Sequence, residues 1–328
     1  MIPMTHPCPN ATTVAGGAVK VALIVPYFGR RPPYFDVFLK SVERIRHFHW
    51  HLLTDCIDLP WPSEQVTVHR TTLADCRAAI ERAAGMPITL DKPYKLCDYR
   101  PVYGLAFPEL LEGCSHWGYG DLDLLMGDVD GFFERFLQRG EEKFLIRGHC
   151  SVFPNTQRML TLFRHATPEV DFARVAATND ACFFDEWGGM AKIYRAAGVS
   201  VYNDPIMADI YKDRAHLSLT EKALDHSHQA FFWHEGRIRR FFLDAQGQIQ
   251  DDEFCYIHLQ KRAMVEPTWQ TGALKAATCI EIRPDRFELV ELLSAQAITR
   301  AIENNAQSLR HDLALYARKV QKRVRAWL

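Results

Sequence analysis

Short apolar runs alternate with amphipathic segments over the first quarter of the chain. Residues 21–25 form a continuous apolar run that Pro26 and Gly29 end, which is typical of a strand buried on both faces of a parallel sheet. The segments that follow predict, in order, a helix over 35–45, strands over 50–55 and 65–69, and a helix over 73–84. This order of strands and helices predicts an α/β fold with an open sheet of the nucleotide-binding kind.

The middle of the chain continues this pattern and then changes. Helical spacing or strand-like apolar runs predict helices over 101–112 and 132–137 and strands over 116–123, 144–146 and 199–202. Strand patterns separated by Gly236 and Gly247 predict a β-meander over 229–260. From about residue 283 the spacing is helical to the end of the chain, whereas residues 1–19, rich in Pro, Thr, Gly and Ala, predict a flexible leader.

Composition and charge limit the classes of function. The 328 residues are 48% hydrophobic and 24% charged, which suits a globular protein with a full core. The formal net charge of −1 offers no general attraction to nucleic acid, so we expect no nucleic-acid partner. Nine scattered cysteines without a CxxC pair, and the lack of a signal sequence or a long apolar run, predict a cytoplasmic protein.

Two aspartates stand where the predicted strand over 116–123 ends. Asp121 and Asp123 are separated by one residue, and carboxylates at positions i and i+2 of an extended backbone project to the same side. Such a pair can share a hard divalent cation, which in turn can hold a diphosphate. The alternative is a solvated turn, but the surrounding residues are apolar, and charge there is costly unless it is paired or bound to a metal.

Two further groups of residues suit the same kind of ligand. Lys95 and Arg100 have side chains that bind phosphate oxygens, and Asp98 between them could accept a hydrogen bond from a ribose or sugar hydroxyl. The alternative for these three is a surface cluster of salt bridges. Near the predicted end of the meander, His258 precedes Lys261 by three positions, although a lone histidine can equally be structural.

Several motifs together resemble the GT-A type of nucleotide-sugar glycosyltransferase, in particular bacterial enzymes of polysaccharide and capsule loci. The motifs are Pro-Tyr-Phe-Gly at 26–29, Pro-Tyr-Lys-Leu-Cys-Asp at 93–98, Trp-Gly-Tyr-Gly-Asp-Leu-Asp at 117–123, Gly-His at 148–149, Asp-Glu at 185–186 and His-Leu-Gln-Lys at 258–261. The resemblance covers roughly residues 21–264. It implies a GT-A-like single domain with a mostly parallel central sheet and metal-dependent transfer of a sugar from a nucleoside-diphosphate sugar.

The resemblance also implies roles for the residues of these motifs. Asp121, Asp123 and His258 would bind the metal, and Lys261 would meet a phosphate. A histidine among the ligands favours Mn²⁺ over Mg²⁺. The nucleotide base would lie at the end of the first strand, at Pro26, Tyr27 and Phe28, although the two aromatic rings could instead pack in the core. Asp55, after the second strand, could bind the base or the ribose.

The resemblance implies that the later motifs contact the acceptor or the transferred sugar. Asp185 and Glu186 resemble the acidic pair that such transferases place near the acceptor, and one of them would be the general base in an inverting enzyme. In a retaining enzyme they would bind sugar hydroxyls instead. His149 would contact the sugar or the acceptor, or else be a surface residue in a turn. We expect a UDP-sugar as donor, and a saccharide or a lipid-linked saccharide as acceptor.

The resemblance predicts three parts for the chain: a leader over 1–19, a catalytic domain over 20–264 and a helical extension over 265–328. Basic residues flank an apolar stripe near the end of the extension. This helix could pack on the domain, pair with a second copy, or lie on an anionic membrane surface. Two other functions remain open, namely a metal-dependent nucleotidyltransferase or phosphohydrolase and a non-catalytic, membrane-associated binding module.

Overall fold

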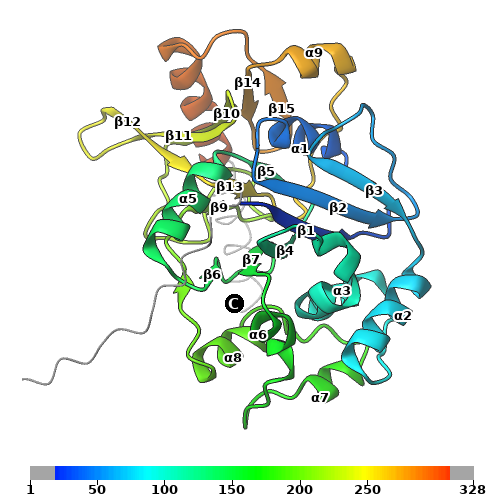
Figure 1. Ribbon diagram of the computed structural model, residues 1–328. Helices are drawn as coiled ribbons and strands as arrows, with labels where there is room; N and C mark the ends of the chain where they lie inside the picture. Colours follow the sequence, from blue (N-terminus) through cyan, green and yellow to red (C-terminus); the bar gives the residue numbers. More distant parts are fainter. Residues whose placement is uncertain (1–18, 311–328) are drawn as a thin grey trace, which may run out of the picture.

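The structure is a computed structural model that describes residues 19–310 (Figure 1). Residues 1–18 of the predicted leader and the basic end of the predicted terminal helix lie outside the described residues. A seven-stranded sheet forms the centre. Its strands, in spatial order, are β3 (Val66–Arg70), β2 (Phe48–Thr54), β1 (Val21–Pro26), β4 (His116–Gly120), β7 (Cys150–Pro154), β6 (Lys143–Phe144) and β8 (Val201–Tyr202). Only β7 runs against its neighbours, so the central sheet is mostly parallel, as predicted.

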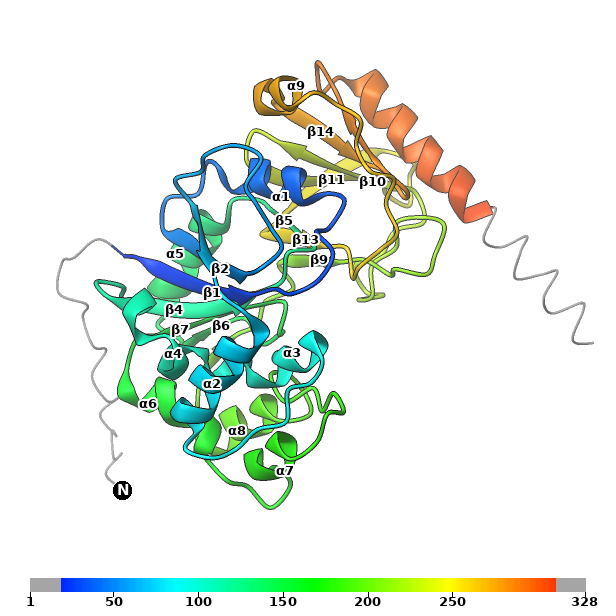
Figure 2. The ribbon, with the colours of Figure 1, turned by 90° about the vertical axis from the view of Figure 1, so that its right-hand side faces the viewer.

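Helices cover both faces of this sheet (Figures 1 and 2). Alternate residues of β1 explain why: Leu23 and Val25 pack on one face, while Ala22 and Ile24 pack on the other. The first face carries α1 (Phe35–Val42) and α5 (Val129–Arg139). The second face carries α2 (Leu73–Ala84), α3 (Leu96–Tyr99), α4 (Tyr103–Ala106), α6 (Gln157–Thr161), α7 (Phe172–Ala176) and α8 (Met190–Ala196). Within residues 19–310, we find no helix that combines the length and apolarity needed to cross a bilayer.

The local sequence explains how well each helix matches its prediction. Helix α2 begins and ends as predicted, because Thr72 and Asp75 exchange capping hydrogen bonds and Gly85 closes it in a left-handed conformation (φ 75°). The single helix predicted over 101–112 is instead α4 flanked by the 3₁₀ turns Arg100–Val102 and Pro108–Leu111. The prolines at the starts of these turns prevent one continuous helix.

A small second sheet lies across the edge of the central sheet where β1 and β4 end. It consists of β5 (Leu124–Met126), β13 (Tyr256–His258) and β9 (Met207–Asp209), with β13 in the middle. Strand β13 runs antiparallel to β5 and parallel to β9. Three segments that are far apart in the sequence are therefore held side by side.

A third sheet contains the predicted meander and part of the predicted extension. Its strands, in order, are β12 (Ile249–Phe254), β11 (Arg237–Leu243), β10 (Gln229–His234), β14 (Cys279–Ile282) and β15 (Phe287–Leu289). The segment that follows residue 264 is thus not helical throughout. It contains α9 (Thr271–Ala276) and two strands before residues 295–310 form a helix. Strand β14 pairs with β10 along its edge. Ala301 and Ile302 of the last helix pack on this sheet (Figure 2).

Candidate functional site

A cavity of about 810 Å³ opens where β1 and β4 end. These two strands are parallel neighbours, so the residues that follow them emerge at the same edge of the sheet. Pro26 is the last residue of β1, Tyr27 and Phe28 follow it, and Asp121 and Asp123 follow β4. The predicted site residues that line the cavity are Pro26, Tyr27, Phe28, Arg100, Asp121, Asp123, His149, Asp185, Glu186, His258 and Lys261.

The register of the small sheet brings the predicted metal ligands together. Asp123 precedes β5, and His258 pairs with Leu124, the first residue of β5. The Nε2 atom of His258 lies 3.6 Å from Oδ2 of Asp123, and one ligand atom from Asp121 lies within 4.8 Å of both residues. The same Asp123 oxygen also accepts a hydrogen bond from the backbone N–H of Lys261 (2.7 Å).

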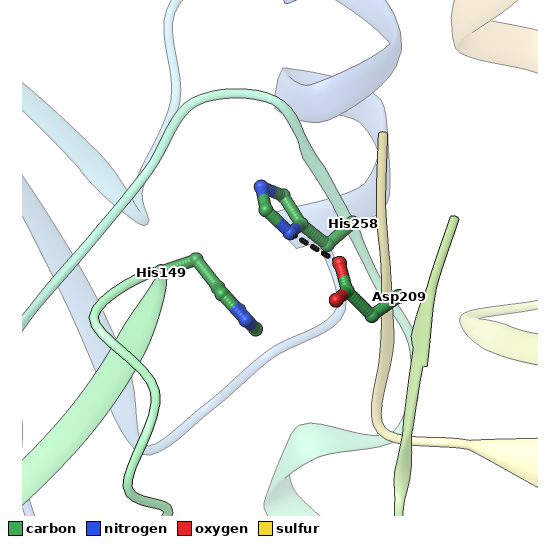
Figure 3. Close-up of side chains that lie close together, drawn as sticks. All are labelled: His149, Asp209 and His258. Carbon is green, nitrogen blue, oxygen red and sulfur yellow. Dashed lines mark hydrogen bonds and ion pairs between the residues drawn. The ribbon is translucent and has the colours of Figure 1, made fainter. Parts of the chain in front are cut away.

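Asp209, which is not among the residues that line the cavity, contacts the imidazole of His258 (Figure 3). Nδ1 of His258 and Oδ1 of Asp209 are 2.8 Å apart, because β9 pairs with β13 at these two residues. Burial alone would lower the pKa of His258, but its hydrogen bonds with Asp123 and Asp209 outweigh burial and raise this pKa to about 10. When Nδ1–H donates to Asp209, Nε2 is the nitrogen left for a metal, as in carboxylate–histidine–metal arrangements.

His149 lies against His258 in the wall of the cavity (Figure 3). The two imidazole rings stack with centroids 4.2 Å apart and an interplanar angle of 21°. Burial, together with the nearby His258, lowers the pKa of His149 well below its usual range, so this ring is neutral. Its Nδ1 pairs with the hydroxyl of Tyr256 at 3.0 Å. The surface position that was the alternative for His149 is therefore wrong.

The donor atoms fit a divalent cation. Asp121 and Asp123 offer carboxylate oxygens and His258 offers an imidazole nitrogen, a set that suits Mn²⁺ and, less well, Mg²⁺. A second cluster, formed by Cys97, Asp98 and Asp185, is a poorer choice. Burial raises the pKa of the Cys97 thiol to about 12, so the thiol stays protonated at neutral pH.

Arg100 lies between Asp121, a predicted metal ligand, and Asp185 of the predicted acidic pair. Its guanidinium forms ion pairs with Asp121 and with Asp185, the latter at 2.7 Å. Burial raises the pKa of Asp185 to about 7, although Arg100 opposes the shift. A carboxyl group with a pKa near neutrality can accept and release a proton at physiological pH. Glu186, the adjacent residue, accepts a hydrogen bond from the backbone N–H of Gly148 (2.6 Å).

The structure does not bring every predicted residue to the cavity. Asp55 is exposed and is not among the residues that line it. Lys95 and Asp98, predicted to bind phosphate and a sugar hydroxyl, form an ion pair at 2.8 Å with both side chains fully buried. Those two predictions are wrong, and so is the surface cluster that was their alternative. Asp98 instead accepts hydrogen bonds from the backbone N–H groups of Cys182 and Phe184, and so holds the loop that carries Asp185.

Sequence reasoning missed Asp209 and Gly148. Strand β9 has only three residues, too few for a recognisable alternation, and nothing in the sequence near Asp209 points to its partner His258. Gly148 appears in a motif, but its importance comes from packing: a Cβ atom there would overlap Oδ2 of Asp185. The glycine itself was the available signal, since a residue without a Cβ atom permits such close approaches.

Comparisons with known proteins identify a family and solved structures that resemble this chain. The solved structure of the galactosyltransferase LgtC, in complex with donor and acceptor sugar analogues, matches with a TM-score of 0.35 and 13% identity, over 57% of this chain and 75% of that chain. No curated protein matches the sequence. Residues 23–291 match a family described as a family of unknown function, DUF6625. Because this match spans most of the chain, the protein belongs to the DUF6625 family.

Proposed function

We propose that the protein is a metal-dependent glycosyltransferase of the GT-A type, which moves a sugar from a nucleoside-diphosphate sugar to a saccharide or lipid-linked saccharide acceptor. One observation carries the proposal: Asp121, Asp123 and His258 converge at a cavity that also contains basic side chains and a second pair of carboxylates. The order of sequence motifs supports it independently.

Different residues of the cavity would bind the donor and the acceptor. Bound Mn²⁺ or Mg²⁺ would supply positive charge for the leaving diphosphate at Asp121, Asp123 and His258. Lys261, whose side chain lines the same cavity, adds a positive charge for a phosphate. Tyr27 and Phe28 offer aromatic surfaces for the base where β1 ends.

Asp185 and Glu186 would act on the acceptor. If the reaction inverts the anomeric configuration, Asp185 is the better candidate for the general base, because its pKa of about 7 suits removal of a hydroxyl proton at neutral pH. Glu186 would then bind a sugar hydroxyl. If the reaction retains the configuration, both carboxylates would position the acceptor and the sugar.

The test is a screen of UDP-, GDP- and CMP-sugars, with mixed saccharide acceptors, for Mn²⁺-dependent release of the nucleotide and formation of a glycosylated product. We expect turnover with one donor class and its loss in Asp123→Asn. Asp251→Asn is the control, because Asp251 lies on β12 in a surface ion pair with Arg239. Nucleotide release without a glycosylated product would identify a hydrolase instead, and no metal-dependent turnover with any donor would refute the proposal.

A further inference from the structure

Two aromatic rings stand exposed beside the cavity. Phe183 lines the cavity, and its ring stacks on that of Trp187 with centroids 5.2 Å apart and an interplanar angle of 21°. The two residues are 38% and 62% exposed, whereas Trp50, Trp117 and Trp233 are at most 1% exposed. The stacked pair still leaves apolar ring surface in water, and this exposure is unfavourable until a ligand covers it.

The backbone of this loop keeps the rings outside. Phe183 has a φ of +53°, in the left-handed region that bulky residues rarely adopt. The next two residues turn inward, so that Phe184 is 0% and Asp185 3% exposed. Unfavourable backbone conformations of this kind gather at functional sites, where the surrounding structure enforces them.

Buried contacts fix the loop in place. The Asp98 carboxylate accepts hydrogen bonds from the backbone N–H groups of Cys182 and Phe184, each at 2.8 Å. Lys95 neutralises Asp98 and also donates to the carbonyl of Asp180 (2.8 Å). A loop held from both sides of Phe183 presents its rings in one arrangement, so little conformational entropy is lost when a ligand binds.

We propose that Phe183 and Trp187 form a platform on which a ring of the acceptor saccharide stacks. A pyranose ring has a face of C–H groups, which packs on aromatic surfaces, and a rim of hydroxyls, which donate hydrogen bonds to carboxylates. The same loop supplies both kinds of contact, because Asp185 and Glu186 lie between the two aromatic residues in the sequence and line the cavity.

Charge favours a neutral sugar over a nucleotide at this platform. Asp185 and Glu186, the ionisable residues between the two rings, are both acidic. The Arg100 guanidinium beside Asp185 is already paired with Asp185 and Asp121, so it offers little free positive charge to a phosphate. The backbone N–H of Lys261 bonds Asp123, and its ammonium group lies 4.4 Å from the centroid of the Tyr94 ring. The inference rests on the proposed function, since it names the class of acceptor that the same cavity would take.

The experiment measures binding of the full chain to an array of defined saccharides in the presence of Mn²⁺ and UDP, followed by titration of the strongest ligand. We expect Trp187→Ala and Phe183→Ala to weaken binding about tenfold or more, as expected for loss of a large aromatic contact. Trp187→Tyr should keep most of the affinity. Leu292→Ala is the matched control, because Leu292 is a 72% exposed apolar residue outside the cavity lining.

Two further measurements separate this inference from the proposed function. Mn²⁺-dependent UDP binding should be equal in wild type and Trp187→Ala, which also shows that the variant is folded. Saccharide affinity unchanged in Trp187→Ala, or no saccharide bound by the wild type, would overturn the platform even if donor turnover is found. A wild-type dimer that Trp187→Ala converts to a monomer would also overturn it, since the rings would then form a protein interface.

Discussion

Asp209 contacts His258 and does not line the cavity. Both of its carboxylate oxygens are hydrogen-bonded: Oδ1 to His258 and to the Gln260 amide, and Oδ2 to the hydroxyl of Thr220. Such a carboxylate fixes the orientation and the tautomer of a metal-binding imidazole. Asp209 is therefore a positioning residue for the candidate metal site.

We predict that Asp209→Asn lowers the affinity for Mn²⁺ by about 10- to 100-fold, the effect typical of losing such a partner. Isothermal titration calorimetry with Mn²⁺ alone measures this without any substrate. Asp204→Asn provides the control, because Asp204 makes a partly exposed ion pair with Arg139. Equal Mn²⁺ affinity in Asp209→Asn and wild type would mean that His258 is oriented by other contacts.

Lys143 is buried, and no acidic side chain within residues 19–310 lies in hydrogen-bond reach of its ammonium group. Its ammonium group donates to Ser151 Oγ (2.7 Å) and to the carbonyl of Leu145, and it lies 4.4 Å from the centroid of the Phe153 ring. Burial lowers the pKa of Lys143 to about 7. The unfolded chain, with a normal lysine pKa, therefore binds one more proton than the folded chain between about pH 7 and pH 10.

This difference predicts that the folded state gains stability relative to a Lys143→Met variant as the pH rises through that window. The change in the free energy of unfolding should approach about 1.4 kcal/mol per pH unit. Below pH 7 the difference between the two proteins should be constant, because Lys143 is then charged in both states. Urea unfolding at pH 6, 7, 8 and 9 measures it, and a difference that does not vary with pH would contradict the shifted pKa.

Individual residues show what the sequence can and cannot reveal. Asp121 and Asp123 could be recognised because both carboxylates interrupt an apolar stretch. Lys95 and Asp98 were misassigned because a buried ion pair and a phosphate site use the same residue types. Only their packing distinguishes them, since the partners Cys182 and Phe184 are more than 80 positions away.

The loop that leads into β7 approaches the 180–189 loop more closely than any side chain would permit. Gly148 lies against Asp185 and Arg100, and a Cβ atom there would overlap both side chains. Its N–H also binds Glu186. The two loops therefore set the position of the acidic pair jointly.

We predict that Gly148→Ala displaces Asp185 and Arg100 and lowers the rate of the proposed sugar transfer by about tenfold to a hundredfold, because small misplacements of catalytic groups are costly. Gly272→Ala is the control, since a Cβ atom at Gly272 meets nothing within 4 Å. Steady-state kinetics with the donor found in the screen checks the prediction. Full activity in Gly148→Ala would mean that the position of Asp185 is unimportant for transfer.

Among whole elements, long periodic ones were predictable and short buried ones were not. Strands β1, β2 and β3 and helix α2 carry clear apolar patterns, and each lies where the pattern places it. Strands β9, β14 and β15 have three or four residues each and depend on partners from distant parts of the chain. Pairing of that kind leaves no local signal in the sequence. The pattern therefore could not indicate that β14 and β15 pair beyond the predicted domain boundary at residue 264.

At the scale of the whole molecule, β14 joins the segment after residue 264 to the rest of the fold. It pairs with β10 on one side and β15 on the other, and all four of its residues are buried. Asn305 adds a second connection, because its buried side-chain amide exchanges hydrogen bonds with the backbone of Leu217. These contacts favour one folding unit that extends through at least residue 305.

We therefore predict that a chain ending at residue 264 loses cooperative unfolding, whereas a chain ending at residue 310 keeps it. Removal of β14 would leave the edge of β10 unpaired and uncover its apolar face. Circular dichroism during thermal unfolding compares the two chains with the full-length protein. A sharp unfolding transition in the shorter chain would instead support a separate domain over 20–264.

The placement of β13 between β5 and β9 also has a consequence for synthesis of the protein. Lys261, whose N–H binds Asp123, lies 138 positions after it, so the ribosome makes the aspartates several seconds before their partners, at roughly 5–20 residues per second. Until β13 and Lys261 have been made, Asp123 has neither His258 nor the Lys261 N–H beside it. A nascent chain would thus be unable to assemble the candidate cation site before residue 261 has been made.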